Sequence, residues 1–302
     1  MTTLRSIVAA TDFSPASDAA VRRALQLATR HGATLCLLHA FDVGAWNSMK
    51  GVFDAQRRAG EPPPDVRMQQ RLADFAAALA AQTEVEVGIH FGLGPPHKVI
   101  AAYIGPHVNT QVSAQAGVLV VIGSRAEPEV AGLGSTALKV VRRPACPVLV
   151  VRVAEDRPYD KLLSAVDLRD GSVRAASLAV ELFPAAHHHL LYALDSQEVA
   201  SNAAWGGLGK ASLTQLHESL HAQADRDLQQ LAQRLSVGTR YPVVAVVAND
   251  VPARAILVGA ANLGADCVVV GHHGLGAATD SYLGSMAQHV IYAALSDVLV
   301  VP

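Results

Sequence analysis

The sequence predicts an α/β protein made of two tandem, doubly wound, Rossmann-like units, each with a five-stranded parallel sheet. Three observations support this fold class. The chain has 302 residues, enough for two domains of ~150 residues each. Apolar strand-like runs alternate with segments of helical periodicity, which is typical of parallel sheets with right-handed crossovers. The strand-like runs also recur in the same order in both halves.

Four pairs of strand-like runs define the internal repeat. Chance similarity between valine-rich strands does not explain four matches that keep the same order. We therefore place one unit at 1–153 and the other at 160–302, joined by the polar segment 154–160. The matched runs are 4–12 with 162–167, 37–42 with 190–195, 117–123 with 265–271, and 147–151 with 297–301.

The first predicted helix follows the first strand directly. Ser14 and Pro15 form a cap and first-turn pair, and Gly32 is a helix stop. Apolar residues recur between them at helical spacing, so we expect one face of this helix to pack on the sheet. That stripe consists of Ala20, Val21, Ala24, Leu25 and Ala28.

The segments after the second strand of each half, 41–64 and 196–209, are predicted to be loops near the mouths of two clefts. Each carries a tryptophan, Trp46 or Trp205. One interpretation is a lid over the cleft. We favour the other, in which these tryptophans pack locally.

Composition and charge exclude several classes of partner. The formal net charge is -2 and no block of like charges occurs, so nucleic acid is not expected as the main partner. No apolar run reaches the ~18 residues of a membrane span, and the N-terminus lacks the form of a signal peptide. Cys36, Cys146 and Cys267 lie far apart without metal-ligand spacing, which indicates free thiols. These features predict a cytoplasmic protein.

The segment from Gly271 to Ser285 carries the strongest functional signal. It reads Gly-His-His-Gly, then nine residues, then Gly-Ser, between an apolar strand-like run and a helical pattern that begins near Met286. Glycines at a strand-to-helix turn let the backbone approach a ligand closely. A helix N-terminus presents unpaired N–H groups and a positive dipole end to an anion. The segment therefore predicts a phosphate-binding loop without the lysine of a P-loop.

This spacing, G-x2-G-x9-G-S, resembles the nucleotide-binding signature of the universal stress protein family. Residues 146–151 resemble that family's closing strand, and residues 7–14 resemble its opening strand and acidic turn. The family usually has arginine before the second glycine, where this chain has His273. The resemblance covers nearly the whole chain, and it implies a tandem universal stress protein.

The resemblance implies an adenine nucleotide site in the second unit, with ATP as the ligand, alone or with Mg²⁺. Signature amides and the Ser285 hydroxyl would hold the phosphates, Asp167 would lie near the nucleoside, and the Ala193 backbone would contact the adenine. A glycine turn that only permits tight strand–helix packing is the alternative. The expected binding residues are Asp167, Ala193, Gly271, His272, His273, Gly274, Gly284, Ser285 and Met286.

The first unit keeps the opening acidic turn but not the phosphate loop. Ala126 stands in place of the second glycine, and seven residues instead of nine lead to Gly134. Glu127 and Glu129 lie in that span, and each would repel a polyphosphate by roughly a kcal/mol if partly screened. We therefore expect this unit to bind nucleotide weakly or not at all.

Two histidine clusters are candidate metal or phosphate ligands. His187, His188 and His189 precede an apolar strand, and because neighbours point to opposite faces they cannot easily share one metal. A polar strand edge is the favoured interpretation. His272 and His273 lie in the signature and, when protonated, could contact phosphate in place of the family's arginine. A metal shared between one of them and ATP phosphates stays open.

The leading hypothesis is an ATP-binding sensor or regulator of the stress response. In the family the closing strands of two units pair, so strands 148–151 and 298–301 could pair within one chain or in a homodimer. The alternative is a nucleotide-free scaffold that recruits an unknown protein partner. Enzymatic turnover is not expected, because no G-x-S-x-G or Cys-x-x-Cys motif occurs, although slow ATP hydrolysis stays open.

A first prediction concerns the protonation of the signature histidines. ATP affinity in the second unit should fall between about pH 6 and pH 8, because an imidazole with a reference pKa near 6.5 loses its proton there. Isothermal titration calorimetry across this range measures the affinity. A flat profile would remove the histidines from phosphate binding.

Overall fold

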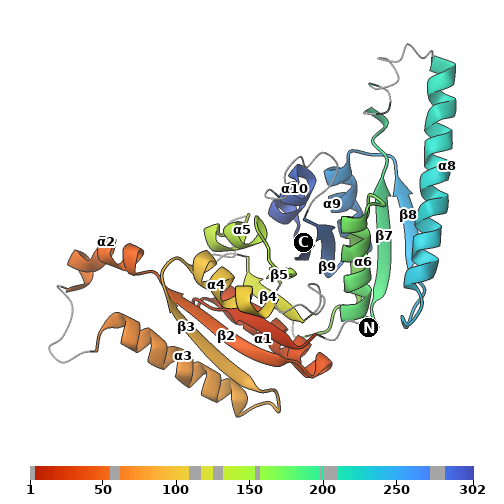
Figure 1. The fold of residues 1–302 in the computed structure, drawn as a ribbon. Coiled ribbons are helices and arrows are strands. Elements are labelled where there is room, and N and C mark those ends of the chain that lie inside the picture. Colours follow the sequence, from red (N-terminus) through yellow and green to blue (C-terminus); the bar gives the residue numbers. More distant parts are fainter. Residues whose placement is uncertain are drawn as a thin grey trace. The chain divides into compact units, whose positions relative to one another are not determined.

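The computed structural model describes residues 4–54, 62–108, 117–124, 132–153, 157–197, 199, 201, 210–272 and 283–302. The chain divides into two compact units, Met1–Asp156 (unit 1) and Arg157–Pro302 (unit 2). In each unit, helices alternate with strands along the chain and flank a sheet (Figure 1).

The sheet of unit 1 has parallel strands in the order β3-β2-β1-β4-β5. The chain runs outward from β1 to β2 and β3, then crosses to β4 and β5 on the other side. Ligands of doubly wound sheets bind at the carboxyl ends of the strands where the order reverses in this way. The strands are β1 (Ser6–Ala10), β2 (Thr34–Phe41), β3 (Val87–Leu93), β4 (Val118–Gly123) and β5 (Val148–Val151).

Unit 2 repeats this topology with parallel strands in the order β8-β7-β6-β9-β10. Its reversal point lies between β6 and β9, as that of unit 1 lies between β1 and β4. The predicted fold class, two tandem units with doubly wound parallel sheets, is confirmed. The strands are β6 (Lys161–Ala165), β7 (His187–Ala193), β8 (Val244–Ala248), β9 (Cys267–Gly271) and β10 (Asp297–Val301).

Helices cover both faces of each sheet, as right-handed crossovers require. In unit 1, α1 and α3 pack on one face and α4 and α5 on the other (Figure 1). In unit 2, α6 and α8 share one face and α9 and α10 the other. The helices are α1 (Pro15–His31), α2 (Val43–Asp54), α3 (Pro64–Ala80), α4 (Pro96–Val108), α5 (Ser135–Val141), α6 (Asp170–Leu182), α8 (Lys210–Leu235), α9 (Pro252–Leu263) and α10 (Ser285–Ala293).

Helix α1 has the predicted ends. The Ser14 hydroxyl accepts a hydrogen bond from the Ser17 amide, and Pro15 occupies the first turn. Gly32 ends the helix in the left-handed conformation, with φ 62°, which glycine adopts without steric penalty. The predicted apolar stripe is buried except at Leu25, which is half-buried.

Residues 43–54, predicted as part of a loop, form the helix α2 instead. The Asp42 side chain explains the difference, because its Oδ1 accepts hydrogen bonds from the amides of Gly44 at 3.0 Å and Ala45 at 3.1 Å. An aspartate at this position stabilises a helix by pairing N–H groups that the first turn leaves unsatisfied. The capping role of Asp42 was the signal that the sequence prediction missed.

The tryptophan of this segment packs locally, as we favoured. The ring of Trp46 lies 6.0 Å from that of Phe41, measured between centroids. In the corresponding segment of unit 2, Ser196 and Gln197 are helical, so that segment is not a loop throughout. Trp205 lies outside the described residues.

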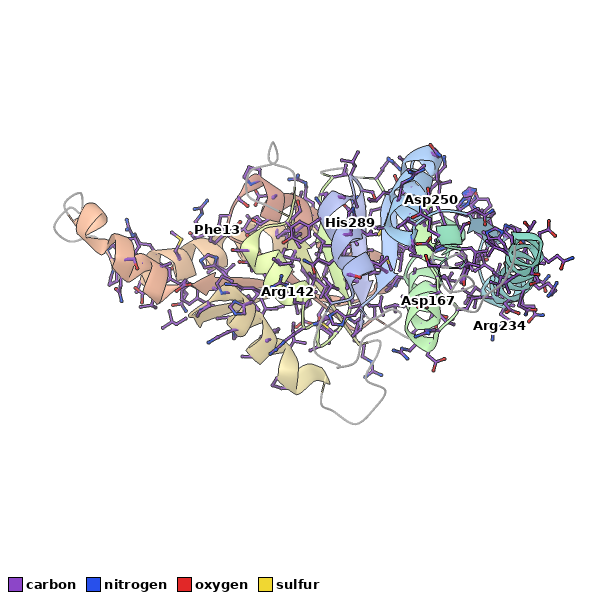
Figure 2. The ribbon with its side chains drawn as sticks, turned by 90° about the horizontal axis from the view of Figure 1, so that it is seen from above. Phe13, Arg142, Asp167, Arg234, Asp250 and His289 are labelled. Atoms are coloured by element: carbon purple, nitrogen blue, oxygen red, sulfur yellow. The ribbon has the colours of Figure 1, made fainter. Side chains whose placement is uncertain are left out.

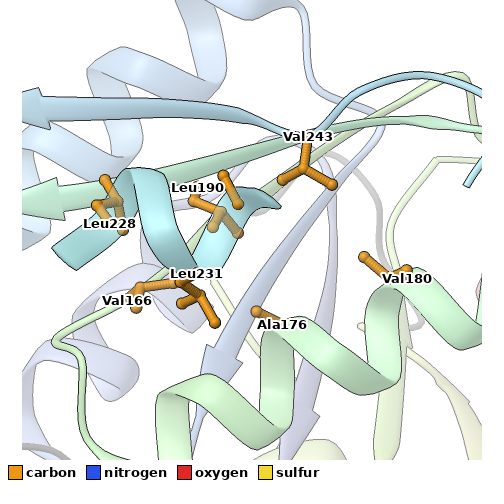
Figure 3. Packing of buried hydrophobic residues seen from close by; sticks show 8 residues of the cluster. Val166, Ala176, Val180, Leu190, Leu228, Leu231 and Val243 are labelled. Carbon is orange, nitrogen blue, oxygen red and sulfur yellow. The ribbon is translucent and has the colours of Figure 1, made fainter. Parts of the chain in front are cut away.

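An apolar cluster between α6, α8 and the sheet forms part of the core of unit 2 (Figure 3). Leu190 of β7 and Leu228 of α8 are 1% and 0% exposed, so the long α8 is anchored by full burial of its inner face. Burying a leucine side chain contributes about 1.5–3 kcal/mol. The buried members are Val166, Ala176, Val180, Leu190, Leu228, Leu231, Ala232 and Val243.

The three adjacent histidines lie inside β7 rather than before it. His188 is 1% exposed, and its Nε2 lies 2.9 Å from the carbonyl oxygen of Phe183. The ring of His187 stacks on that of Tyr241, with centroids 3.8 Å apart. The expected divergence of neighbouring imidazoles is therefore present. The expected polar edge was wrong, because β7 pairs with both β6 and β8.

Part of the predicted connector is bound to unit 2. One carboxylate oxygen of Asp266, Oδ2, accepts hydrogen bonds from the amides of Asp160 at 2.6 Å and Lys161 at 2.9 Å. Its Oδ1 accepts another from the Arg157 guanidinium at 2.5 Å. Partial burial acts to raise the pKa of Asp266, but these hydrogen bonds outweigh it and the net pKa is lowered.

The three cysteines lie in the interior of their units. Cys36, Cys146 and Cys267 are free and buried, as predicted. Burial raises the pKa of Cys146 to about 12, so this thiol stays protonated.

Within the described ranges, no helix combines the length and the apolar character that crossing a membrane requires.

A close approach between a strand end and a helix start recurs in both units. Gly123 ends β4, and a Cβ placed there would lie 2.7 Å from the Ala16 carbonyl oxygen in the first turn of α1. Gly271 ends β9, and its Cβ would lie 3.3 Å from the backbone carbon of Gly171 in α6. Glycine at the strand end therefore lets the helix start lie directly against it.

These distances predict unequal effects of adding one methyl group. Gly123→Ala should destabilise unit 1 by about 1–3 kcal/mol, because backbone atoms must shift to admit the Cβ. The equivalent Gly271→Ala should reduce the stability of unit 2 by less, because its added Cβ would lie 3.3 Å from the backbone carbon of Gly171, only slightly closer than ordinary contact. Urea unfolding followed by circular dichroism measures both variants. Equal losses would show that the close approach in unit 1 is not a constraint.

Candidate functional site

Each unit has a tight turn between its first strand and its first helix. Phe13 in unit 1 and Leu168 in unit 2 adopt left-handed backbone conformations, with φ 61° and 63°. Non-glycine residues rarely take this conformation, and where they do it often marks a functional turn. Figure 2 labels Phe13 and Asp167, which belong to these two turns.

In unit 1 the carboxylate of Asp12 holds the turn. Its Oδ1 accepts hydrogen bonds from the Ser14 amide at 3.0 Å and the Ser14 hydroxyl at 2.5 Å. The Asp12 amide in turn donates to the Ser17 hydroxyl at 3.3 Å. Partial burial acts to raise the pKa of Asp12, but the hydrogen bonds from Ser14 and Ser17 have the larger combined effect and the net pKa is lowered. The carboxyl is therefore ionised at neutral pH.

Unit 2 builds the same turn from a different sequence. The Oδ1 of Asp167 accepts hydrogen bonds from the Arg169 amide at 3.1 Å and the Ser172 hydroxyl at 2.6 Å. The Asp167 amide donates to the Ser172 hydroxyl at 3.1 Å. The sequence of this turn departs from the form of unit 1, yet the aspartate and the serine five residues later keep the geometry.

A cavity of about 420 Å³ lies at the carboxyl ends of β1, β2 and β4 in unit 1. Its size falls in the range of small-molecule sites, roughly 300–1,000 Å³. It occupies the reversal point of the strand order, where ligands of doubly wound sheets bind. The residues that line it come from the acidic turn, the strand ends and the starts of α1, α4 and α5.

The unit 1 residues equivalent to the predicted site line this one cavity. The matching pairs follow from the shared order of elements, and each member occupies the same place in its unit. The residues Asp12, Ala40, Gly123, Gly134 and Ser135 border the cavity, and they correspond to Asp167, Ala193, Gly271, Gly284 and Ser285 in unit 2.

In unit 2 the start of the signature continues the sheet. Gly271 is the last residue of β9 and is buried. The amide of His272 donates to the Val301 carbonyl oxygen at 2.7 Å, and the His272 side chain is buried. His273 and Gly274, both predicted site residues, lie outside the described residues.

The end of the signature forms the start of α10. Gly284 is the N-cap, and its amide donates to the His272 carbonyl oxygen at 3.0 Å. Ser285 is exposed and Met286 is half-buried in the first turn. Unit 1 has the same closure, because the Gly134 amide donates to the Ser124 carbonyl oxygen at 2.5 Å. In both units, this amide joins the strand end to the helix start.

The acidic turn and the second strand supply the other side of the site. Asp167 follows β6, and Ala193 ends β7, where it pairs with Ala248 of β8. Both are half-buried. The strand-end Gly271 approaches Ser172, whose hydroxyl binds Asp167. Asp167 and the start of the signature are therefore neighbours.

Some residues of the cavity carried no signal in the sequence. Pro96 and Ile100 of α4 line the unit 1 cavity, but a proline and an isoleucine on a helix match no binding motif. Ser17 and Ser172 were missed as well. An aspartate followed five residues later by serine in both repeats was the signal that could have identified them.

No metal site accompanies these features in the described part of the chain. There, no group of three or more His, Cys, Asp or Glu side chains is placed to hold an ion. A site built partly from residues of 273–282 falls outside this statement, because those residues are not described.

The family model of the universal stress proteins matches the chain twice, over residues 3–152 and 158–302. The chain belongs to the universal stress protein family. Each match covers one of the two tandem units, in agreement with the repeat found in the sequence and in the strand order. The predicted membership is confirmed.

Known universal stress proteins support the tandem arrangement. One from Mycobacterium tuberculosis is 33% identical over 192 residues, which are 60% of this chain and 61% of that protein. A second from the same species is 28% identical over 313 residues, with 97% of this chain and 95% of the relative covered.

A solved universal stress protein from Archaeoglobus fulgidus has the same fold. It superposes with a TM-score of 0.67 at 16% sequence identity, and the match covers 98% of this chain and 97% of that one. The tandem architecture is thus present along the full length of another universal stress protein.

The acidic turn of unit 2 yields a prediction. Ser172→Ala removes the hydroxyl that binds both the carboxylate and the amide of Asp167, and it should destabilise unit 2 by about 1–3 kcal/mol. Thermal unfolding measures this loss. Ser177→Ala is the matched control, because that hydroxyl donates only to the Val173 carbonyl oxygen within α6. If both variants lost the same stability, the turn would not depend on Ser172.

Proposed function

We propose that this universal stress protein is an ATP-binding regulator whose nucleotide occupies unit 2. The site lies at the carboxyl ends of β6, β7 and β9. Asp167 lies beside the nucleoside, the Ala193 backbone contacts the adenine, and the start of α10 faces the phosphates. ATP binds alone or with Mg²⁺.

The unit 1 cavity is the observation that carries this proposal. Residues equivalent to five of the proposed site residues converge on one cavity of about 420 Å³ at the strand reversal point. The two acidic turns share their hydrogen-bond geometry, so the same arrangement in unit 2 supports a site of the same kind there. The phosphate signature is complete in unit 2 alone.

The phosphate contacts follow from the start of α10. A helix leaves its first amides without intrahelical acceptors, so the amides of Ser285, Met286 and Ala287 are the donors that we assign to the phosphates. The Gly284 amide closes the turn through His272, and we assign it to that structural role. Gly271 and Gly274 let the backbone pass close to the ligand.

The two signature histidines have different proposed roles. The side chain of His272 is 3% exposed, so we assign it to the interior of unit 2. His273 stands where the family usually has arginine, and the pH dependence of ATP affinity rests on this residue. A protonated imidazole next to the phosphates supplies part of the charge that arginine would bring.

We propose binding rather than turnover as the role of the site. Among the described residues that line the unit 1 cavity, Asp12 is the one with a titratable side chain, and its carboxylate is held by Ser14. The equivalent Asp167 is held by Ser172. A carboxylate engaged in this way serves to shape the site more than to accept a proton.

The closing strands β5 and β10 give a proposed route to assembly. Each ends its own unit's sheet and pairs with one neighbour there, β4 or β9. A strand edge without a neighbour in its own unit favours association with another strand. We propose that these strands pair, within the chain or in a homodimer, and present a surface to a protein partner.

The test compares Gly274→Glu with Ala126→Glu, the equivalent position of unit 1. Mass analysis of ligand released from gently denatured protein should give about one ATP per chain for the wild type. Gly274→Glu adds bulk and negative charge beside the phosphates and should lower ATP affinity at least about tenfold. Ala126→Glu should leave ATP binding unchanged.

Two results would contradict the proposal. Loss of ATP in Ala126→Glu, with binding kept in Gly274→Glu, would move the site to unit 1. Absence of any retained or titratable adenine nucleotide in the wild type would favour the nucleotide-free scaffold.

A further inference from the structure

Strand β8 forms one end of the unit 2 sheet and has an open edge (Figure 1). On its β7 side, the Ala248 carbonyl oxygen accepts a hydrogen bond from the Leu194 amide at 2.8 Å. Successive residues of a strand point their backbone groups to opposite sides. The N–H and C=O groups of Ala245 and Val247 therefore point away from β7, and no other described residue bonds to them.

One face of β8 is open as well. Ala245 and Val247 pack against the apolar cluster of unit 2, which lies on the α8 side. Val244 and Val246 point to the opposite face, and each is 44% exposed. Helix α9 packs on that face over β6 and β7. The two valines therefore form an apolar stripe next to the open edge.

The sequence of β8 does nothing to prevent pairing with another strand. Natural edge strands usually carry a charge, a proline or a bulge that blocks association, whereas β8 reads Val-Ala-Val-Val-Ala. The corresponding end strand of unit 1, β3, contains Gly88 and Gly92, and glycines weaken a strand. Of these two strands, β8 is the better edge for association.

Two antiparallel copies of β8 complement each other. With a two-fold axis at Ala245, this residue exchanges both backbone hydrogen bonds with Ala245 of the second copy. The Val247 amide then donates to the Val243 carbonyl oxygen of the second copy. Val244 lies opposite Val246 of the second copy, in the pair type that brings side chains closest.

The same register brings opposite charges together. Arg240 lies five residues before the axis and Asp250 five residues after it, so each lies opposite the other in the second copy. Arg240 is exposed and Asp250 is half-buried. Complementary charges across an interface favour one partner and one orientation. One register therefore matches the backbone groups, the exposed valines and the charges.

We propose that the β8 edge of unit 2 pairs antiparallel with the β8 edge of a second copy of this chain, about a two-fold axis at Ala245. This edge lies at the end of the unit 2 sheet opposite β10, so the inference is independent of the nucleotide site and of pairing by the closing strands. A pair of five-residue strands is small beside stable interfaces of about 1,200–2,000 Å². The association should therefore be weak, with a Kd of about 1–100 μM.

Sedimentation velocity of the full chain across this concentration range tests the proposal. Val246→Lys places a charge opposite Val244 of the second copy and should weaken the association at least about tenfold. Val237→Lys is the matched control, because Val237 is 84% exposed and lies outside the strands, and it should leave the association unchanged. Circular dichroism checks that both variants fold.

Three results of this experiment would overturn the proposal. One is a wild-type chain that shows no association that rises with concentration. Another is a dimer that Val246→Lys does not weaken, because its interface would lie elsewhere. The third is growth into polymers, because a two-fold contact closes at the dimer.

Cysteine cross-linking tests the register. Val244→Cys protein mixed with Val246→Cys protein should form a disulfide-linked dimer under mild oxidation, because Cα atoms of such a pair lie about 4.5 Å apart. Each variant alone should cross-link at least about tenfold more slowly, since its cysteine lies opposite a valine. The native cysteines are buried. Cross-linking of Val246→Cys alone as fast as in the mixture would overturn the axis at Ala245, and with it the proposal.

Discussion

Each unit depends on the close approach of its first helix to the end of its fourth strand. Gly123 in unit 1 and Gly271 in unit 2 leave no side chain between them, so the helix start lies against the strand end. This contact sets the acidic turn beside the end of the fourth strand. The acidic turn and the end of the fourth strand thereby meet at the carboxyl edge of a parallel sheet, where ligands of doubly wound folds bind.

The strained turns show how the sequence secures that arrangement. A left-handed conformation at Phe13 or Leu168 is unfavourable by itself, at roughly 1–3 kcal/mol. The neighbouring aspartate and a serine five residues on hold each turn through side-chain hydrogen bonds. Unit 2 keeps this geometry although its turn sequence differs, because the aspartate and the serine five residues on are present in both turns.

Local signals predicted those parts of the fold that short-range chemistry determines. The Ser14 cap and the Gly32 stop predict the ends of α1, and the alternation of strand-like and helical segments predicts the parallel sheets. The sequence does not predict helix α2, because its cap, Asp42, is also the last residue of the repeated strand match 37–42. The burial of His272 and the Gly284 contact with His272 depend on β10 and α10 folding together, so spacing within the signature could not indicate them.

The central claim is that ATP phosphates meet the amides at the start of α10 and not those of unit 1. The most direct measurement is amide NMR of isotope-labelled protein during an ATP titration. The account predicts large shifts for the amides of Gly271, Ser285 and Met286, with little change at Gly123 and Ser135. Shifts confined to Gly123 and Ser135, with Ser285 and Met286 unmoved, would contradict it.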